Sequence, residues 1–141
     1  MSTTTPLTIT QLQERAHTQA VRGGHHEHRP SDGPGLIHYR MAQLSLMHKQ
    51  LSDVFQELWR GEALAENYYP AMDTHDSGEH PYRAPGTGGY GKPYGVPAAC
   101  ADLLILLLDF CGQEGIDLEA ATRERMALNA GNAPVHGWKL S

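Results

Sequence analysis

The chain contains few cysteines, so disulfide bonds cannot be what holds it together. Only two of its 141 residues are cysteines. Cys100 and Cys111 are eleven residues apart on one predicted helix, too far apart to bridge within one chain. We therefore expect two reduced core thiols in a cytosolic protein. The N-terminus also lacks a basic region followed by an apolar stretch, so no signal peptide is expected.

Basic residues and long apolar runs are scarce as well. Eleven Lys and Arg residues stand against sixteen Asp and Glu residues, which gives a formal net charge of −5. No predicted helix carries a basic stripe, so nucleic acid is not an expected partner. The apolar run over residues 103–108 is far shorter than the roughly 20 residues that cross a bilayer. These absences favour a cytoplasmic protein that does not enter a membrane.

No segment alternates apolar and polar residues as a strand does, and no internal repeat is visible. Capping and breaking residues instead delimit four helices. The pattern predicts an all-α fold in a single domain over residues 1–141, with a Gly- and Pro-rich loop over about 62–96 and an irregular tail over about 130–141. The helices are expected from Thr8 or Thr10 to about Val21, from about Leu36 to Trp59, from Pro97 to about Gly112 or Gly115, and from Asp117 to about Asn129.

Acidic side chains lie on the second and third predicted helices. Asp53 and Glu57 share one helix face with Gln50, at spacings of three and four residues. Asp102 and Asp109 interrupt an apolar helix that is expected to be buried, where an ionised carboxylate is costly without a cation or a donor. If the two helices pack antiparallel, Asp53, Glu57 and Asp102 would meet in a chamber with Gln50 at its edge. Such carboxylates bind magnesium together with substrate phosphates, although a solvated helix face would also explain Asp53 and Glu57.

Several segments follow one another in an order that is known from a protein family. They are residues 8–17 (TITQLQERAH), 46–57 (LMHKQLSDVFQE), 92–97 (KPYGVP), 101–109 (ADLLILLLD) and 115–119 (GIDLE), followed by Asn129 and His136-Gly137. Together they resemble the MazG-like branch of the all-α nucleoside triphosphate pyrophosphatases over nearly the whole chain. The resemblance implies a helical bundle completed by a homodimer or tetramer, and cleavage of a nucleoside triphosphate into a monophosphate and pyrophosphate.

The same resemblance implies a damaged metal site. In the family, magnesium is bound by Glu-x-x-Glu in one helix and by Glu-x-x-Asp in the next. Gln50 and Asp53 fall on the first motif here, and Ala99 and Asp102 on the second, so two of four carboxylates are absent and a third is shortened. Counting nearby acids as substitutes, the metal set (Mg²⁺ or Mn²⁺, weakly bound or lost) is Asp53, Glu57, Asp102 and Asp109, of which Asp53, Glu57 and Asp102 are the catalytic candidates.

The implied phosphate contacts are altered too. Asn132 stands where the family has an arginine, and Arg125 stands in place of a lysine, which is not an equivalent exchange where contact geometry matters. The phosphate-binding candidates that remain are Lys92, Arg125, Asn129 and His136.

Three functions are consistent with these residues. The favoured hypothesis is a nucleotide-binding protein with weak or lost hydrolysis, since two formal charges are missing from the metal set. The second is an active pyrophosphohydrolase in which Glu57 replaces a missing ligand and Lys92 or Arg125 neutralises the leaving pyrophosphate. The third is a structural or regulatory oligomer that binds no nucleotide, in which cationic partners satisfy Asp102 and Asp109.

Histidine-rich loops leave another possibility open. Residues 25–28 (HHEH), and His75-Asp76 with Glu79-His80, have side chains of the kind that bind zinc or nickel. Neither has the spacing of a closed metal site, and polar surface loops explain both equally well. His48 interrupts the apolar series of the second helix, where a core or interface position is expected.

Overall fold

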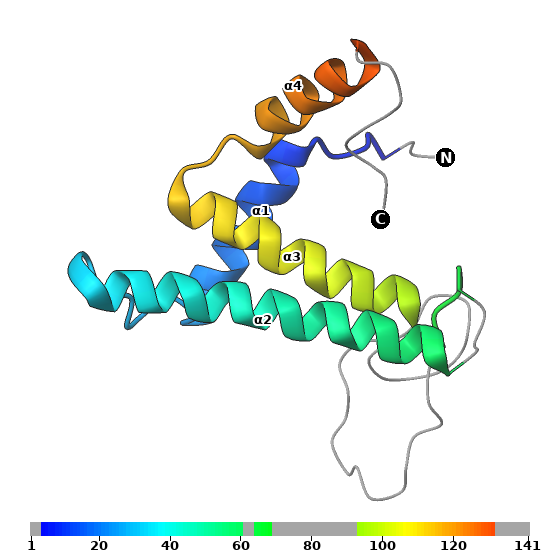
Figure 1. Ribbon diagram of the computed structural model, residues 1–141, viewed down its shortest axis with the longest axis horizontal. Coiled ribbons are helices and arrows are strands. Elements are labelled where there is room, and N and C mark those ends of the chain that lie inside the picture. The colour runs from blue at the N-terminus through cyan, green and yellow to red at the C-terminus, as the bar shows by residue number, and fades with distance from the viewer. Residues whose placement is uncertain (1–3, 61–63, 69–92, 132–141) are drawn as a thin grey trace, which may run out of the picture. The chain divides into compact units, whose positions relative to one another are not determined.

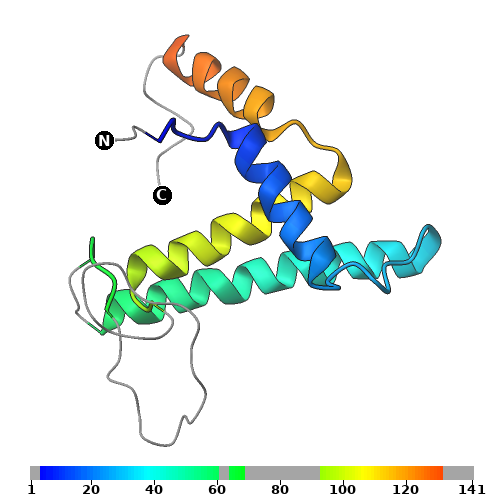
Figure 2. The same ribbon diagram turned by 180° about the vertical axis from the view of Figure 1, so that it is seen from behind.

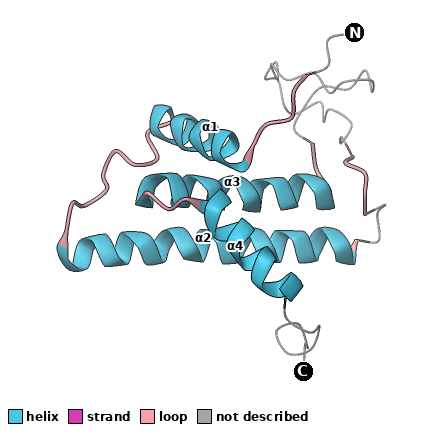
Figure 3. Cartoon of the chain, turned by 90° about the horizontal axis from the view of Figure 1, so that it is seen from above, coloured by secondary structure: helices cyan, strands magenta, loops and turns pink. Residues whose placement is uncertain are grey.

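The computed structural model describes residues 4–60, 64–68 and 93–131, and within them the chain is all-helical. Four helices follow one another (Figure 1): α1 (Ile9–Arg22), α2 (Gly33–Trp59), α3 (Val96–Glu114) and α4 (Leu118–Gly131). The described residues form no strand, as Figure 3 shows, and one antiparallel bridge joins Tyr68 to Tyr94. The predicted all-α class and its four helices are therefore confirmed.

The contacts divide the chain into two compact units. The first consists of residues 1–28 and 107–141 and is named the terminal unit. The second consists of residues 29–106 and is named the central unit. The first part of α3 thus belongs to the central unit, and its last part belongs to the terminal unit.

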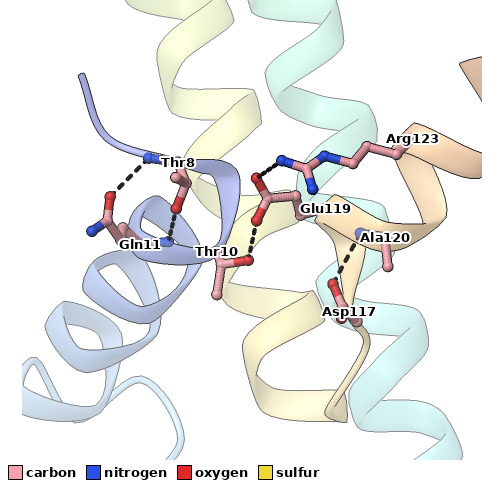
Figure 4. Close-up of polar contacts among 7 residues, drawn as sticks. All are labelled: Thr8, Thr10, Gln11, Asp117, Glu119, Ala120 and Arg123. Carbon is pink, nitrogen blue, oxygen red and sulfur yellow. Dashed lines mark hydrogen bonds and ion pairs between the residues drawn. The ribbon is translucent and has the colours of Figure 1, made fainter. Parts of the chain in front are cut away.

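The helix ends lie close to the predicted capping residues. The Thr8 side chain accepts the backbone N–H of Gln11, whose side chain accepts the N–H of Thr8, so α1 begins with a capping box. Asp117 accepts the N–H of Ala120 and caps α4 (Figure 4). α2 begins at Gly33 rather than near Leu36, because a proline is tolerated in the first turn of a helix.

The terminal unit is built around α1. This helix contacts α4, and Thr10 donates a hydrogen bond to Glu119, which also pairs with Arg123 at 3.2 Å (Figure 4). Gln13 donates to the backbone carbonyl of Ile116 at 2.8 Å. Among the described residues of this unit, the buried apolar side chains are Ala16, Leu108 and Cys111.

In the central unit, α2 and the first part of α3 lie side by side and run in opposite directions (Figure 1 and Figure 2). Residues 64–68 form hydrogen bonds with the residues at the start of α3. Tyr68 and Tyr94 exchange backbone hydrogen bonds of 2.8 and 2.9 Å, and the Asn67 side chain accepts the N–H of Ala98 at 2.8 Å. At Gly95, where φ is +124°, a Cβ would lie 3.0 Å from a backbone oxygen of this segment, so glycine allows the close approach.

Burial differs from what the sequence predicts. None of the 27 residues of α2 is buried. The apolar residues of its predicted core face are 44–62% exposed: Met41, Leu44, Leu51, Phe55 and Leu58. His48 is exposed as well.

The expectation of a buried α3 is correct at Leu108 but wrong at Leu104 and Ile105, which are exposed. The expectation of two core thiols is likewise wrong for Cys100, which is exposed, while Cys111 is buried. Helical periodicity identifies an apolar face, but it does not say whether the same chain covers that face.

α3 is long and apolar enough to cross a membrane, judged by length and composition. It has 19 residues and a mean hydropathy of 1.6. The length argument from residues 103–108 is therefore wrong, because residues 98–101 and 110–111 extend the apolar composition past both aspartates. The core helix of a soluble protein passes the same test, so this single helix is weak support for a membrane span.

Candidate functional site

A cavity of about 240 Å³ lies in the central unit, between the C-terminal half of α2 and the start of α3. The α2 side chains that line it are three and four residues apart and therefore share one face. From α3 and the residues before it come Tyr94, Ala99 and Asp102. The structure thus brings Gln50, Asp53, Glu57 and Asp102 to one cavity.

Two of these carboxylates already have partners. Asp53 pairs with Lys49 at 3.1 Å, and because these side chains are 36% and 66% exposed the pair is weak. Glu57 accepts a hydrogen bond of 3.2 Å from the hydroxyl of Tyr68, which in turn accepts one of 2.9 Å from Arg60. Desolvation, and then the hydrogen bond to Glu57, raise the pKa of Tyr68. The Tyr68 phenol therefore stays protonated and remains a donor to Glu57.

Asp102 differs from both. Its side chain is half-buried and lines the cavity, and no described residue forms a hydrogen bond or ion pair with its carboxylate. Asp102 is followed by an apolar run in α3. A carboxylate in this setting is costly unless a ligand satisfies it. The lining contributed by described residues contains three carboxylates and no lysine or arginine, so the cavity is suited to a cation.

Asp109 does not belong to this cavity. It is 8% exposed and lies in the terminal unit, where His17 Nδ1 is 3.0 Å from its Oδ1 and His26 Nε2 is 2.9 Å from both of its carboxylate oxygens. Asp109 is therefore not among the residues that line the cavity with Asp53, Glu57 and Asp102. A seven-residue spacing places two side chains on one helix face, but two turns apart they meet different neighbours.

The described residues contain one cluster in which three potential metal ligands converge. The donor atoms of His17, His26 and Asp109 all lie within 4.8 Å of one another. The carboxylates of Asp53, Glu57 and Asp102 are not gathered this closely. A cation in the cavity would thus have one or two protein carboxylates and take its other ligands from water and a bound phosphate, as magnesium commonly does.

The remaining predicted residues lie elsewhere. Arg125 and Asn129 are exposed on α4, in the terminal unit. Lys92 and His136 lie outside the described residues, as do Asn132 and the histidines at 75 and 80. His17 is a residue that sequence reasoning missed. Its only signal is indirect, because a lone aspartate in an apolar helix requires a donor, and donors 83 and 92 residues away cannot be identified from local spacing.

Comparisons with known proteins return no match to any family model, curated protein or solved structure.

Proposed function

We propose that the cavity between α2 and α3 binds a nucleoside triphosphate with magnesium or manganese, and that hydrolysis is weak or lost. The observation that carries this proposal is Asp102, a half-buried carboxylate that lines the cavity with no partner among the described residues. A triphosphate beside three carboxylates is repelled unless a divalent cation lies between them. The acidic lining therefore supports a metal–nucleotide complex over a free nucleotide.

The donor set of the cavity fits magnesium in kind. Asp53, Glu57 and Asp102 supply only oxygen ligands, which hard cations prefer. Asp102 would be the principal ligand, with Asp53 or Glu57 as the second. A bound magnesium ion would neutralise phosphate charge and polarise a water molecule. Gln50 and Ala99 also line the cavity, and they occupy the two positions where the resemblance implies further acids, which supports weakened hydrolysis.

Aromatic side chains at the cavity suit a nucleobase. Tyr94 lines the cavity and is 41% exposed, and its ring stacks on that of Tyr68 with centroids 5.9 Å apart and an interplanar angle of 25°. The Tyr68 backbone bridge and its contact with Glu57 hold this pair in place. We propose that the ring of Tyr94 stacks on the base.

An active pyrophosphohydrolase is the alternative that has specific support. Glu57 lies one turn beyond Asp53 and lines the same cavity, so it can replace a missing ligand. The two functions differ in what Gln50→Glu does. If hydrolysis is limited by the missing acid, this nearly isosteric change raises pyrophosphate release at least tenfold; if Glu57 already replaces it, release is substantial in the parent chain and changes little.

We further propose that two or more copies of the chain associate through α2. Its apolar series from Met41 to Leu58 is 44–62% exposed. Phe55 and Trp59 stack with centroids 6.2 Å apart while being 62% and 81% exposed. An exposed apolar face of this length is typical of an interaction surface. A homodimer or tetramer, or a purely structural oligomer without nucleotide, would cover it. A cytoplasmic location stays a prediction from the sequence.

The test is a screen of the tag-free chain against the common ribo- and deoxyribonucleoside triphosphates, with magnesium or manganese, that records thermal shift and pyrophosphate release. Binding without release supports the favoured function, and binding with release supports the alternative. Asp102→Asn is expected to abolish both responses, with Glu66→Gln as a control because Glu66 is exposed and does not line the cavity. A chain that ignores every nucleotide while Phe55→Glu reduces its molecular mass in solution would instead be a structural oligomer.

A further inference from the structure

The terminal unit contains a buried carboxylate that two histidines approach from different segments. Asp109 is 8% exposed, and the side chains of His26 and His17 are 8% and 30% exposed. We propose that His17, His26 and Asp109 form a binding site for a divalent transition-metal ion of the zinc class. This site is separate from the proposed nucleotide site in both its residues and its ligand chemistry.

The donor set selects the kind of metal. Two imidazole nitrogens and one carboxylate oxygen suit Zn²⁺, Co²⁺, Ni²⁺ or Fe²⁺, whereas Mg²⁺ and Ca²⁺ prefer oxygen ligands alone. Three protein ligands leave a fourth position to water in a tetrahedral site. The part of His17 that remains exposed gives such a water molecule access from solvent.

The distances are close to what a metal requires. Both histidine nitrogens lie 2.9–3.0 Å from Asp109 oxygens, and all three donors lie within 4.8 Å of one another. In a tetrahedral site with bonds of about 2.0–2.1 Å, neighbouring ligand atoms are about 3.3 Å apart. To bind a metal, each histidine nitrogen would move a few tenths of an ångström away from the Asp109 oxygens. The remaining gap between the donors would be closed by a shift of the His17 side chain, which is 30% exposed.

The backbone holds the three donors in place before any metal binds. After α1, the N–H of His25 bonds to the carbonyl of Ala20, and the N–H of Gly24 bonds to that of Val21. With φ of +77° at Gly24, this is a Schellman turn, which reverses the chain immediately before His26. On α3, a Cβ at position 112 would lie 2.7 Å from His17 Cβ, so Gly112 lets α1 and α3 approach closely beside Asp109.

A proton on each histidine is the competing explanation of the same geometry. Each ring would then donate one hydrogen bond to the carboxylate. His26 Nε2 is equally distant, at 2.9 Å, from both oxygens of Asp109, so its N–H would be shared between them, and a zinc titration distinguishes this network from a metal site. Cys111 is also buried in this unit, but burial raises the pKa of its thiol, which disfavours the thiolate that a metal would need.

The experiment measures zinc affinity on the full-length, tag-free chain. The protein is stripped with a chelator and titrated with Zn²⁺ against a chromophoric competitor, with Mg²⁺ in excess. His26→Ala and His17→Asn remove one ligand each; because the asparagine amide nitrogen lies where His17 Nδ1 lies, it is expected to keep a hydrogen bond to Asp109, so this variant separates the ligand role from the hydrogen-bonding role. His28→Ala is the matched control, because His28 is exposed on the same turn. Circular dichroism checks that each variant is folded.

We expect one tightly bound equivalent of Zn²⁺ in the parent chain and in His28→Ala. We expect affinity to fall at least tenfold in His26→Ala and His17→Asn. Co²⁺ in place of Zn²⁺ should give visible absorption bands of a four-coordinate site, and His17→Asn should weaken or abolish them. Absence of tight binding in the parent chain, equal affinity in all four proteins, or an equal loss in His28→Ala would overturn the site and leave the cluster as a hydrogen-bond network.

Discussion

Each unit of this chain contains one aspartate of α3, but the two carboxylates differ in their partners. In the terminal unit, Asp109 is 8% exposed and has two histidines within 3.0 Å. In the central unit, Asp102 is half-buried beside a cavity and has no partner among the described residues. The same residue type, seven positions apart on one helix, is paired with two histidines in one unit and faces a cavity in the other.

This difference shows that sequence context alone does not assign a role to a buried acid. Both aspartates border the apolar run over residues 103–108, and the desolvation argument applies to both. The segments that reach each side chain decide the outcome.

The contrast should be largest in the stability of matched amide variants. Asp109→Asn places an amide opposite His26 and removes a charged acceptor from a buried site, so we expect the free energy of unfolding to fall by about 3 kcal/mol. Asp102→Asn loses no hydrogen bond and should lie within about 0.5 kcal/mol of the parent chain. Urea unfolding followed by circular dichroism, with chelator present, measures both values. Equal losses in the two variants would contradict the contrast.

The two cysteines should differ in reactivity. Cys100 belongs to the central unit and is exposed, whereas Cys111 belongs to the terminal unit and is 3% exposed. Burial also raises the pKa of Cys111, which lowers its thiolate fraction at neutral pH. We expect a disulfide reagent to modify Cys100 about a hundredfold faster than Cys111. Rates in Cys100→Ser and Cys111→Ser assign the two phases, and similar rates would mean that the terminal unit opens readily.

A methyl group at position 112 should disturb the packing beside Asp109. Replacing a helical glycine by alanine ordinarily stabilises a protein by about 0.5–1 kcal/mol. At Gly112 the added Cβ would lie 2.7 Å from His17 Cβ, so we expect a net loss of about 1 kcal/mol. Gly131→Ala is the control, because nothing lies within 4 Å of its added Cβ. A more stable Gly112→Ala variant would show that α1 and α3 are not this close.

The smallest effect is expected at the surface of the central unit. Lys49 pairs with Asp53, but the two side chains are 66% and 36% exposed. Lys49→Ala should therefore change the free energy of unfolding by less than about 0.5 kcal/mol. It should also strengthen Mg²⁺ binding, since it removes a competing cation from Asp53. Isothermal titration with MgCl₂ measures that second effect, and weaker Mg²⁺ binding in Lys49→Ala would argue against Asp53 as a ligand.

Local rules predict much of this fold. Thr8, Pro97 and Asp117 identify where three of the helices begin, because caps and first-turn prolines depend only on neighbouring residues. The joint placement of Asp53, Glu57 and Asp102 also follows from helix periodicity together with antiparallel packing. These are properties of a single helix or of two helices that lie side by side.

The partners of Asp109 could not be predicted in this way. His26 and His17 are 83 and 92 residues distant in sequence, and no spacing rule links such positions. The exposure of the apolar residues of α2 and of Cys100 could not be predicted either, because a helical pattern shows which face is apolar but not which neighbour covers it. What sequence reasoning lacks here is the set of long-range contacts, which decides where each apolar or acidic side chain lies.

The central claim is that the cavity lined by Asp102 binds a metal–nucleotide complex. The most direct measurement compares the thermal shift of the parent chain and of Asp102→Asn with ATP, GTP, CTP and UTP, each with and without Mg²⁺. The account predicts that at least one nucleotide raises the melting temperature only when Mg²⁺ is present, and that Asp102→Asn abolishes the rise while remaining as stable as the parent chain. An equal rise in both proteins, or no rise with any nucleotide, would contradict it.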